Sequence, residues 1–116
     1  MSDPKLVFDR EAALVHLDGD VDLLREGAVI FLEDTPKLVD AVREAIGRKE
    51  PEALMRAAHT LKGSAANFAA NETVVAAYRL ERMGRERNLE NVEDAFEQLQ
   101  RALDPLRAAL AALAEE

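Results

Sequence analysis

The chain has 116 residues, no cysteine and no tryptophan, and its 15 Lys and Arg against 23 Asp and Glu give a net charge of −8. This length suits a single domain over residues 1–116, and the lack of cysteine excludes disulfides, a thiol nucleophile and a cysteine metal site. The acidic balance opposes general binding to nucleic acid or anionic membranes. The sequence also lacks a signal-peptide core and any run of roughly 18 apolar residues, so we expect a cytoplasmic protein.

The first two predicted helices lie in residues 8–47. Abundant Ala, Leu, Glu and Arg, with few β-branched runs, favour an all-helical protein. Phe8–Leu17 is predicted as a short helix with Asp9 as its N-cap, and Asp20 is predicted to cap the next helix. That helix carries apolar residues at alternating spacings of four and three. The spacing predicts one continuous apolar seam along the helix, and the proline within the helix predicts a kink. The seam consists of Leu24, Ala28, Phe31, Thr35, Leu38, Val42 and Ala45, and the proline is Pro36.

Three further helices are predicted after Gly47. Proline near the first turn indicates a helix over Pro51–Ala70, and a second helix follows over Glu72–Arg87. The second places Thr73, Ala77, Leu80 and Gly84 on one side, with Arg79 and Arg82 on the other. The last helix begins at Leu89 and crosses Pro105, where we expect a second kink. Its seam is formed by Leu89, Val92, Phe96, Leu99, Leu103, Leu106, Leu110 and Leu113.

Four long amphipathic helices with short connections predict an all-α fold, an antiparallel four-helix bundle with a short additional N-terminal helix. A long coiled-coil homodimer is the competing architecture. The breaks near Gly19, Gly47, Asn71 and Asn88 divide the chain into pieces of bundle length, so we favour the monomer.

His59 is predicted to face outward from its helix. On a helical wheel the core stripe centres on Leu61 and includes Leu54, Ala57, Ala58, Ala65 and Phe68, whereas His59 lies about 160° away. Its outward neighbours are Met55, Arg56, Gly63, Ala66 and Ala70, flanked by Lys62 and Asn67. A lone histidine in a helix is usually a satisfied core group or an ordinary surface residue.

The surroundings of His59 favour a different interpretation. Gly63, Ala66 and Ala70 carry almost no side chain, so another protein could approach the imidazole, and Lys62 can place its ammonium beside a group attached to the ring. Imidazole is nucleophilic near neutral pH, and phosphoimidazole is a reactive phosphoryl donor. Residues 53–89 also carry a net charge of +3, which suits an anion or an acidic partner, although a solvated face gives the same count.

The sequence shows no nucleotide-binding machinery to accompany this histidine. It has no Walker-type glycine loop and no acidic pair convincingly placed for magnesium. His16, the other histidine, is predicted to be structural. The chain could therefore carry a phosphoryl group but shows no means of taking one from ATP.

The stretch His59-Thr60-Leu61-Lys62-Gly63-Ser64-Ala65-Ala66-Asn67-Phe68 resembles the signature of histidine-containing phosphotransfer (HPt) domains of two-component phosphorelays. A looser resemblance covers nearly the whole chain, through Phe8-Asp9, Gly19-Asp20, Leu23-Leu24, Phe31-Leu32, Leu80-Glu81 and the leucine-rich last helix. The sequence departs from the signature at Ala69, where the family often has a glycine, and this departure concerns the end of the helix predicted over Pro51–Ala70.

The resemblance implies that His59 accepts a phosphoryl group from a receiver-domain aspartate and passes it to another receiver. It implies a carrier rather than an enzyme, with no cofactor of its own, because the receiver supplies magnesium and the acidic site. Lys62 would support the phosphoryl group, Gly63 would permit close docking, and Ser64 and Asn67 would orient or flank the site. Further candidates for receiver docking are Ala66, Arg56, Arg79 and Arg82.

The partners implied are response-regulator receivers or a hybrid histidine kinase. Two other functions fit the same sequence: a regulator that docks receivers without phosphotransfer, and the histidine-bearing domain of a chemotaxis-type kinase. A metal- or haem-binding bundle is a distant alternative, since His16 and His59 lie on different predicted helices and no HExxH or Glu-x-x-His motif appears.

Overall fold

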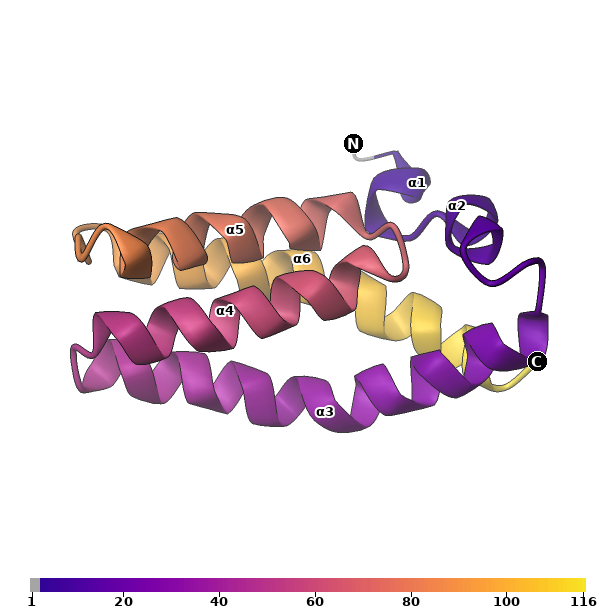
Figure 1. Cartoon of the computed structure of the whole chain (residues 1–116), viewed down its shortest axis with the longest axis horizontal. Helices are drawn as coiled ribbons and strands as arrows, with labels where there is room; N and C mark the ends of the chain where they lie inside the picture. The colour runs from indigo at the N-terminus through magenta and orange to yellow at the C-terminus, as the bar shows by residue number, and fades with distance from the viewer. Residues whose placement is uncertain (1–2) are drawn as a thin grey trace.

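The computed structural model describes residues 3–116, and its regular elements in this range are all helices, which confirms the all-α prediction. Four of the helices are long and lie side by side along the long axis, and the two short ones lie near one end (Figure 1). The described chain measures 41 × 28 × 21 Å. The helices are α1 (Pro4–Val7), α2 (Arg10–Val15), α3 (Val21–Gly47), α4 (Pro51–Ala66), α5 (Asn71–Arg85) and α6 (Val92–Ala114).

The four long helices pack in a closed ring. Helix α3 contacts α4 and α6, and α5 contacts the same two helices. Consecutive long helices are joined by short connections and run in opposite directions, as the colour order in Figure 1 shows. Each long helix therefore buries its apolar stripe against two others, which is the arrangement expected for amphipathic helices of this length.

The N-terminal segment contains two short helices: α2 lies within the predicted helix Phe8–Leu17 but is shorter, and α1 precedes that range and was not predicted. Asp3 accepts a hydrogen bond from the Lys5 backbone at 3.0 Å, and the following proline starts a separate turn, α1. Phe8 is extended, and Asp9 then caps α2 as predicted by accepting from the backbone of Ala12 at 3.1 Å. Each acidic cap starts its own helix because its carboxylate satisfies a backbone N–H that lacks a helical partner.

Helix α3 begins at the predicted cap and runs through its proline without interruption. Asp20 accepts from the backbone of Leu23 at 3.0 Å. Figure 1 shows α3 bowed near its middle, consistent with the missing N–H of Pro36. The predicted seam is buried except at Leu38, which is half-buried, while Val39 takes the buried position.

Helix α4 ends at Ala66, four residues before the predicted end. Ala69 adopts a left-handed backbone conformation with φ of +49°, and the N–H of Ala70 bonds to the carbonyl of Ala65 at 3.2 Å. Ala70 is fully buried, so its predicted outward position is wrong. The cause is the early end of the helix, because the turn directs Ala70 toward the core.

Helices α4 and α5 approach each other closely at Gly84. A Cβ on this residue would lie 2.5 Å from the carbonyl oxygen of Pro51 and 2.7 Å from the backbone nitrogen of Met55. Such distances are too short for any side chain, so only glycine fits at this contact. Gly84 and the other three residues predicted on that side of α5 are all buried.

Helix α6 starts at Val92 rather than at Leu89. Asn91, just before the helix, has a left-handed φ of 65°, and Leu89 lies in the preceding turn, partly buried. The remaining seven residues of the predicted seam are buried, and the helix passes through Pro105. Among residues 3–116, none of the helices has both the length and the apolar content that crossing a membrane requires.

Candidate functional site

His59 projects from the exposed side of α4. Its neighbours Ala58 and Leu61 are fully buried, whereas 67% of the His59 side chain is exposed. The outward orientation predicted from the helical wheel is therefore confirmed. The imidazole is accessible to another protein, although one of its nitrogens is engaged.

That engaged nitrogen contacts a buried carboxylate on the neighbouring helix. Nδ1 of His59 lies 3.2 Å from Oε2 of Glu81 on α5, and only 2% of the Glu81 side chain is exposed. Two cations reach the same carboxylate: Nζ of Lys62 lies 2.7 Å from Oε1, and the Arg85 guanidinium bonds to Oε2. The Lys62 contact is an ion pair without aligned hydrogen-bond geometry. Four side chains from two helices thus meet at one buried charge.

The charge of Glu81 decides which ring nitrogen of a neutral His59 carries the proton. Burial acts to raise the pKa of Glu81, but contacts with Lys62, Arg85 and His59 together outweigh it and lower that pKa below its ordinary value. An ionised carboxylate can only accept hydrogen bonds. Nδ1 of a neutral His59 must therefore carry the proton and donate it, which leaves the lone pair on Nε2 for chemistry.

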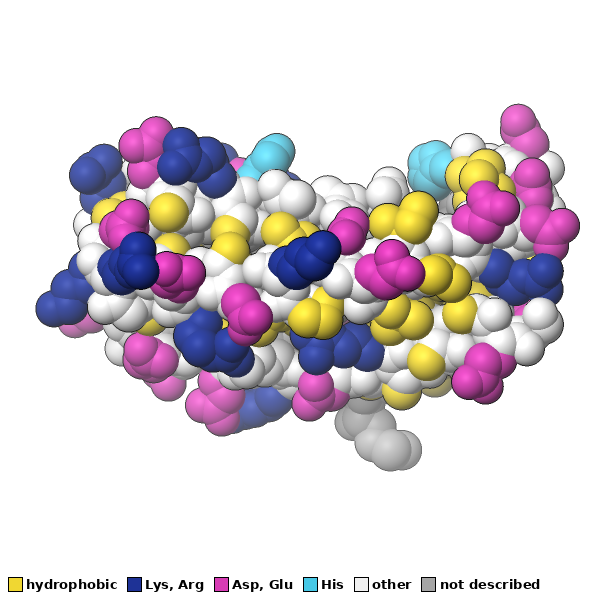
Figure 2. Space-filling view, turned by 90° about the horizontal axis from the view of Figure 1, so that it is seen from below, with side chains coloured by type: hydrophobic (Ala, Val, Ile, Leu, Met, Phe, Trp, Pro, Cys, Tyr) yellow, Lys and Arg dark blue, Asp and Glu magenta, His cyan; other side chains and the backbone are white. Residues whose placement is uncertain are grey.

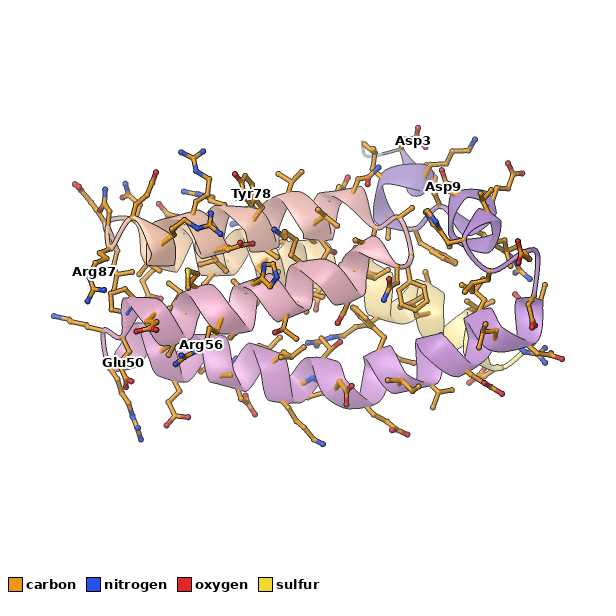
Figure 3. The ribbon with its side chains drawn as sticks, in the orientation of Figure 1. Asp3, Asp9, Glu50, Arg56, Tyr78 and Arg87 are labelled. Carbon is orange, nitrogen blue, oxygen red and sulfur yellow. The ribbon has the colours of Figure 1, made fainter. Side chains whose placement is uncertain are left out.

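Lys62 lies on the histidine's side of α4, as predicted, but its ammonium is already paired. Besides the contact with Glu81, Nζ lies 5.1 Å from the centre of the Tyr78 ring, and a quarter of the side chain is exposed. Figure 3 labels Tyr78 along the outer edge of α5. The carboxylate and the ring face hold the ammonium close to the imidazole without exposing it fully.

The predicted arginines occupy different places. Arg79 donates to Gln98 on α6 at 2.7 Å, so it is directed toward α6 and away from α4. Arg82 pairs at 3.4 Å with Glu86, the residue that caps the end of α5, and lies 6.0 Å from the Tyr78 ring centre.

Arg56 lies on α4, on the side that faces α3 in Figure 3, and pairs with Glu52 at 3.5 Å. Arg85, which the sequence analysis did not select, is the arginine that reaches the carboxylate beside His59.

The surface beyond His59 carries small side chains. Gly63 and Ala66 are exposed, and a Cβ built on Gly63 would meet no atom within 4 Å. Ser64 is half-buried and Asn67 is exposed at the end of α4. Open space around Gly63 supports the expectation that this position provides clearance.

An apolar groove continues from this surface toward the N-terminal helices. It has a volume of about 730 Å³, and Ser64, Ala66 and Asn67 line it together with Ile30 of α3 and His16, which caps the end of α2. Leu23 and Ile30, which also line the groove, are 46% and 57% exposed. Figure 2 shows the hollowed surface between the two histidines, with apolar side chains in it.

Glu81 and Arg85 are the site residues that the sequence analysis missed. Their signal was present in the spacing: Glu81 follows Ala77 by four residues and precedes Gly84 by three, so it falls on the buried stripe of α5. A carboxylate on a buried stripe requires a charged partner, and the nearest candidates are cations on adjacent helical turns. The helical wheel of α4 could not show that Glu81 contacts His59, because Glu81 lies on α5.

Within residues 3–116 no group of three or more His, Cys, Asp or Glu side chains is placed to hold a metal ion.

The model of the Hpt domain family matches residues 26–109 of the chain. The chain belongs to the Hpt domain family. Hpt domains are phosphocarrier modules of phosphorelays and interact there with receiver domains and kinases. No curated protein and no solved structure gave a significant match.

The family match covers most of α3, all of α4 and α5, and most of α6. It includes His59, Lys62, Glu81 and Arg85. Helices α1 and α2, and with them His16 at one end of the groove, precede the matched residues.

Proposed function

We propose that His59 accepts a phosphoryl group on Nε2 from a receiver-domain aspartate or a kinase and passes it to another receiver. One observation carries this proposal: Nδ1 of an exposed imidazole lies 3.2 Å from the buried carboxylate of Glu81, the position from which it donates a proton to an ionised carboxylate. This arrangement leaves Nε2 as an accessible nucleophile near neutral pH.

The transfer step follows from this geometry. The Nε2 lone pair attacks the phosphorus of the aspartyl phosphate, an N–P bond forms, and the P–O bond to the aspartate breaks. The aspartate leaves as a carboxylate with the bonding electron pair. Nδ1 keeps its proton, and the positive charge that the ring gains lies beside Glu81 at 3.2 Å. Transfer to the next receiver is the reverse of this step with a second aspartate.

The partner supplies what this chain does not. The receiver holds the magnesium ion and the acidic site, so the chain acts as a phosphoryl carrier and not as an enzyme. Lys62 stabilises the charge of the phosphoryl group. The small residues Gly63 and Ala66, with Ser64 and Asn67 beside the groove, allow the receiver's aspartate to reach Nε2. Arg56 and Arg82 lie on the rim of this contact, and Arg79 lies farther away.

The fold supports the same function. The ring of four long helices agrees with an antiparallel four-helix bundle, which acts as a monomeric, cytoplasmic module in this proposal. A rigid bundle keeps His59 on α4 and Glu81 on α5 in register, because both side chains start from packed helices.

Two other functions use the same surface. A regulator that only docks receivers would not need the paired imidazole, and the contact between His59 and Glu81 therefore favours transfer. The histidine-bearing domain of a chemotaxis-type kinase would use His59 in the same way but would be phosphorylated by a separate catalytic domain. Phosphorylation by a receiver, rather than by such a catalytic domain with ATP, separates these possibilities.

The test is incubation with a phosphorylated receiver, followed by measurement of protein-bound phosphate. The protein should gain one phosphoryl group that acid removes and alkali leaves, as expected for phosphohistidine. His59→Gln should abolish labelling with helicity and melting nearly unchanged, since the side chain is exposed. His16→Gln, which changes the other histidine, should be labelled as the wild type. Labelling that survives in His59→Gln would contradict the proposal.

A further inference from the structure

The apolar groove beside the phosphoryl acceptor carries two carboxylates that the proposed transfer step does not use. Glu26 and Asp34 of α3 line the groove on either side of Ile30, and all three side chains are exposed. Apart from His16, they are the only titratable residues that line the groove within the described chain. An exposed apolar side chain thus lies between two negative charges.

Both carboxylates are free to bind a cation from another protein. Within residues 3–116 no Lys, Arg or His side chain lies within ion-pair distance of either one. The two arginines of α3 are engaged elsewhere, Arg25 with Asp22 at 2.6 Å and Arg43 with Asp40 at 2.7 Å. The groove therefore offers two charges that the fold itself leaves without a partner.

Charge is divided between the two ends of the molecule. Residues 9–34, which include α2 and the first half of α3, carry eight Asp and Glu against two Arg. Residues 53–89, which include His59, carry six Lys and Arg against three Glu. In Figure 2 most of the charged side chains at the right-hand end, beyond the groove, are acidic. A partner that covers both His59 and the groove meets opposite charges at its two ends.

We propose that Glu26 and Asp34 select and orient the receiver, by favouring one that places an apolar helix against Ile30 and a cation beside each carboxylate. This inference rests on the proposed function. The two carboxylates are eight residues apart on one helix, which is about 12 Å along its axis. The cations on the receiver's helix should therefore be seven or eight residues apart, about two turns, with an apolar residue between them.

The groove lies within reach of a protein docked on His59. Ser64 and Asn67 line the groove, and Asn67 follows His59 by eight residues, about 12 Å along the axis of α4. A receiver whose acidic site faces the cations beside His59 therefore covers the groove with its adjoining surface. In the reverse orientation its acidic site would face Glu26 and Asp34, and like charges would repel.

The charges are tested with Glu26→Gln and Asp34→Asn, using the phosphorylated receiver that transfers fastest to the wild type in a screened panel. Each variant should lower the second-order rate constant roughly two- to fivefold at about 0.1 M salt. The loss should be smaller at about 1 M salt, where the screening length falls from about 10 Å to about 3 Å.

Glu33→Gln is the matched control for charge, because Glu33 is exposed on α3 but lies outside the groove. The chain has a net charge of −8, so removing any carboxylate would by itself favour an acidic receiver. The control should therefore transfer at the wild-type rate or slightly faster. A loss of rate confined to Glu26→Gln and Asp34→Asn requires contacts at the groove.

The apolar contact is tested with Ile30→Ala, which should raise the receiver concentration for half-maximal rate about tenfold. Ile30 is 57% exposed and alanine is the better helix former, so the variant should fold. Val29→Ala is the matched control, since Val29 is 42% exposed on α3 outside the groove, and it should leave that concentration unchanged. The phosphohistidine lifetime, which requires no docking, reports whether the site itself is intact.

Equal rate constants for Asp34→Asn and Glu33→Gln, or equal half-saturation for Ile30→Ala and Val29→Ala, would overturn the inference while the proposed function stands. Failure of every phosphorylated receiver in the panel to label His59 would overturn both.

Discussion

Substitutions at Gly63 separate the clearance that docking needs from the stability of the fold. Gly63 lies in the interior of α4, one turn after His59, with an ordinary helical backbone and no atom within 4 Å of a built Cβ. Glycine in such a position costs about 1 kcal/mol relative to alanine. Gly63→Ala should therefore raise the free energy of unfolding by about 1 kcal/mol, a shift of roughly 3 to 5 °C in the melting temperature.

Gly63→Gln should also fold, with a gain of about 0.5 kcal/mol from its better helix propensity. Its side chain, however, would stand on the exposed surface one turn from the imidazole. A receiver held even about 1 Å too far from Nε2 loses up to about a hundredfold in rate, so we expect phosphotransfer to fall by at least tenfold. Stability and activity should thus move in opposite directions.

The assay pairs a thermal melt of each Gly63 variant with its phosphotransfer rate from one fixed receiver. Ala108→Gln is the matched control, because Ala108 is exposed in the interior of α6, a helix that carries none of the proposed site residues. This control should transfer at the wild-type rate. Phosphotransfer at the wild-type rate by Gly63→Gln would refute the idea that Gly63 provides clearance for the receiver. Loss of stability in both Gly63 variants would indicate instead that the backbone at this position requires glycine.

Three further predictions concern stability. Ala69→Gly should stabilise the protein by about 1 kcal/mol, since glycine adopts the left-handed φ of +49° without steric cost, and a lower melting temperature would contradict this. Gly84→Ala should destabilise it by about 2 kcal/mol in urea melts, because its Cβ would overlap the backbone of α4. The lowered pKa of Glu81 means that its ion pairs stabilise the fold above the ordinary glutamate range, about pH 4.3, and that this contribution is lost as the pH falls. The difference in unfolding free energy between wild type and Glu81→Gln should therefore narrow from pH 7 to pH 3, and an equal difference at both values would refute it.

The helical periodicity of the sequence was sufficient to predict the four long helices and their inner faces. The leucines of α6 and the seam of α3 recur at spacings of three and four, and this pattern identifies most of the buried residues, with Leu38 and Val39 of α3 as the exception. The outward position of His59 followed from the same geometry because it depends only on residues of its own helix.

Helix ends and contacts between helices were harder to predict, for separate reasons. The end of α4 depends on Ala69 in a left-handed conformation, which alanine adopts only when surrounding contacts hold it there. The presence of α1 and the short length of α2 depend on Asp3 and Asp9, each of which caps a separate turn. The direction of Arg79 toward Gln98 depends on how α5 is rotated against α6, and the pattern of α5 by itself allows more than one rotation.

Gly84 links the packing of the helices to the chemistry of His59. Without a side chain at this position, α5 lies against the first turns of α4, with 2.5 Å between the site of a Cβ and the Pro51 carbonyl oxygen. Glu81 lies about one turn earlier on the same buried stripe of α5, so the close approach at Gly84 brings its carboxylate to Nδ1 of His59. A side chain at residue 84 would separate the helices where they are closest and lengthen that contact as well. The loss of stability expected for Gly84→Ala should therefore be accompanied by slower phosphotransfer, whereas Ala69→Gly should change stability alone.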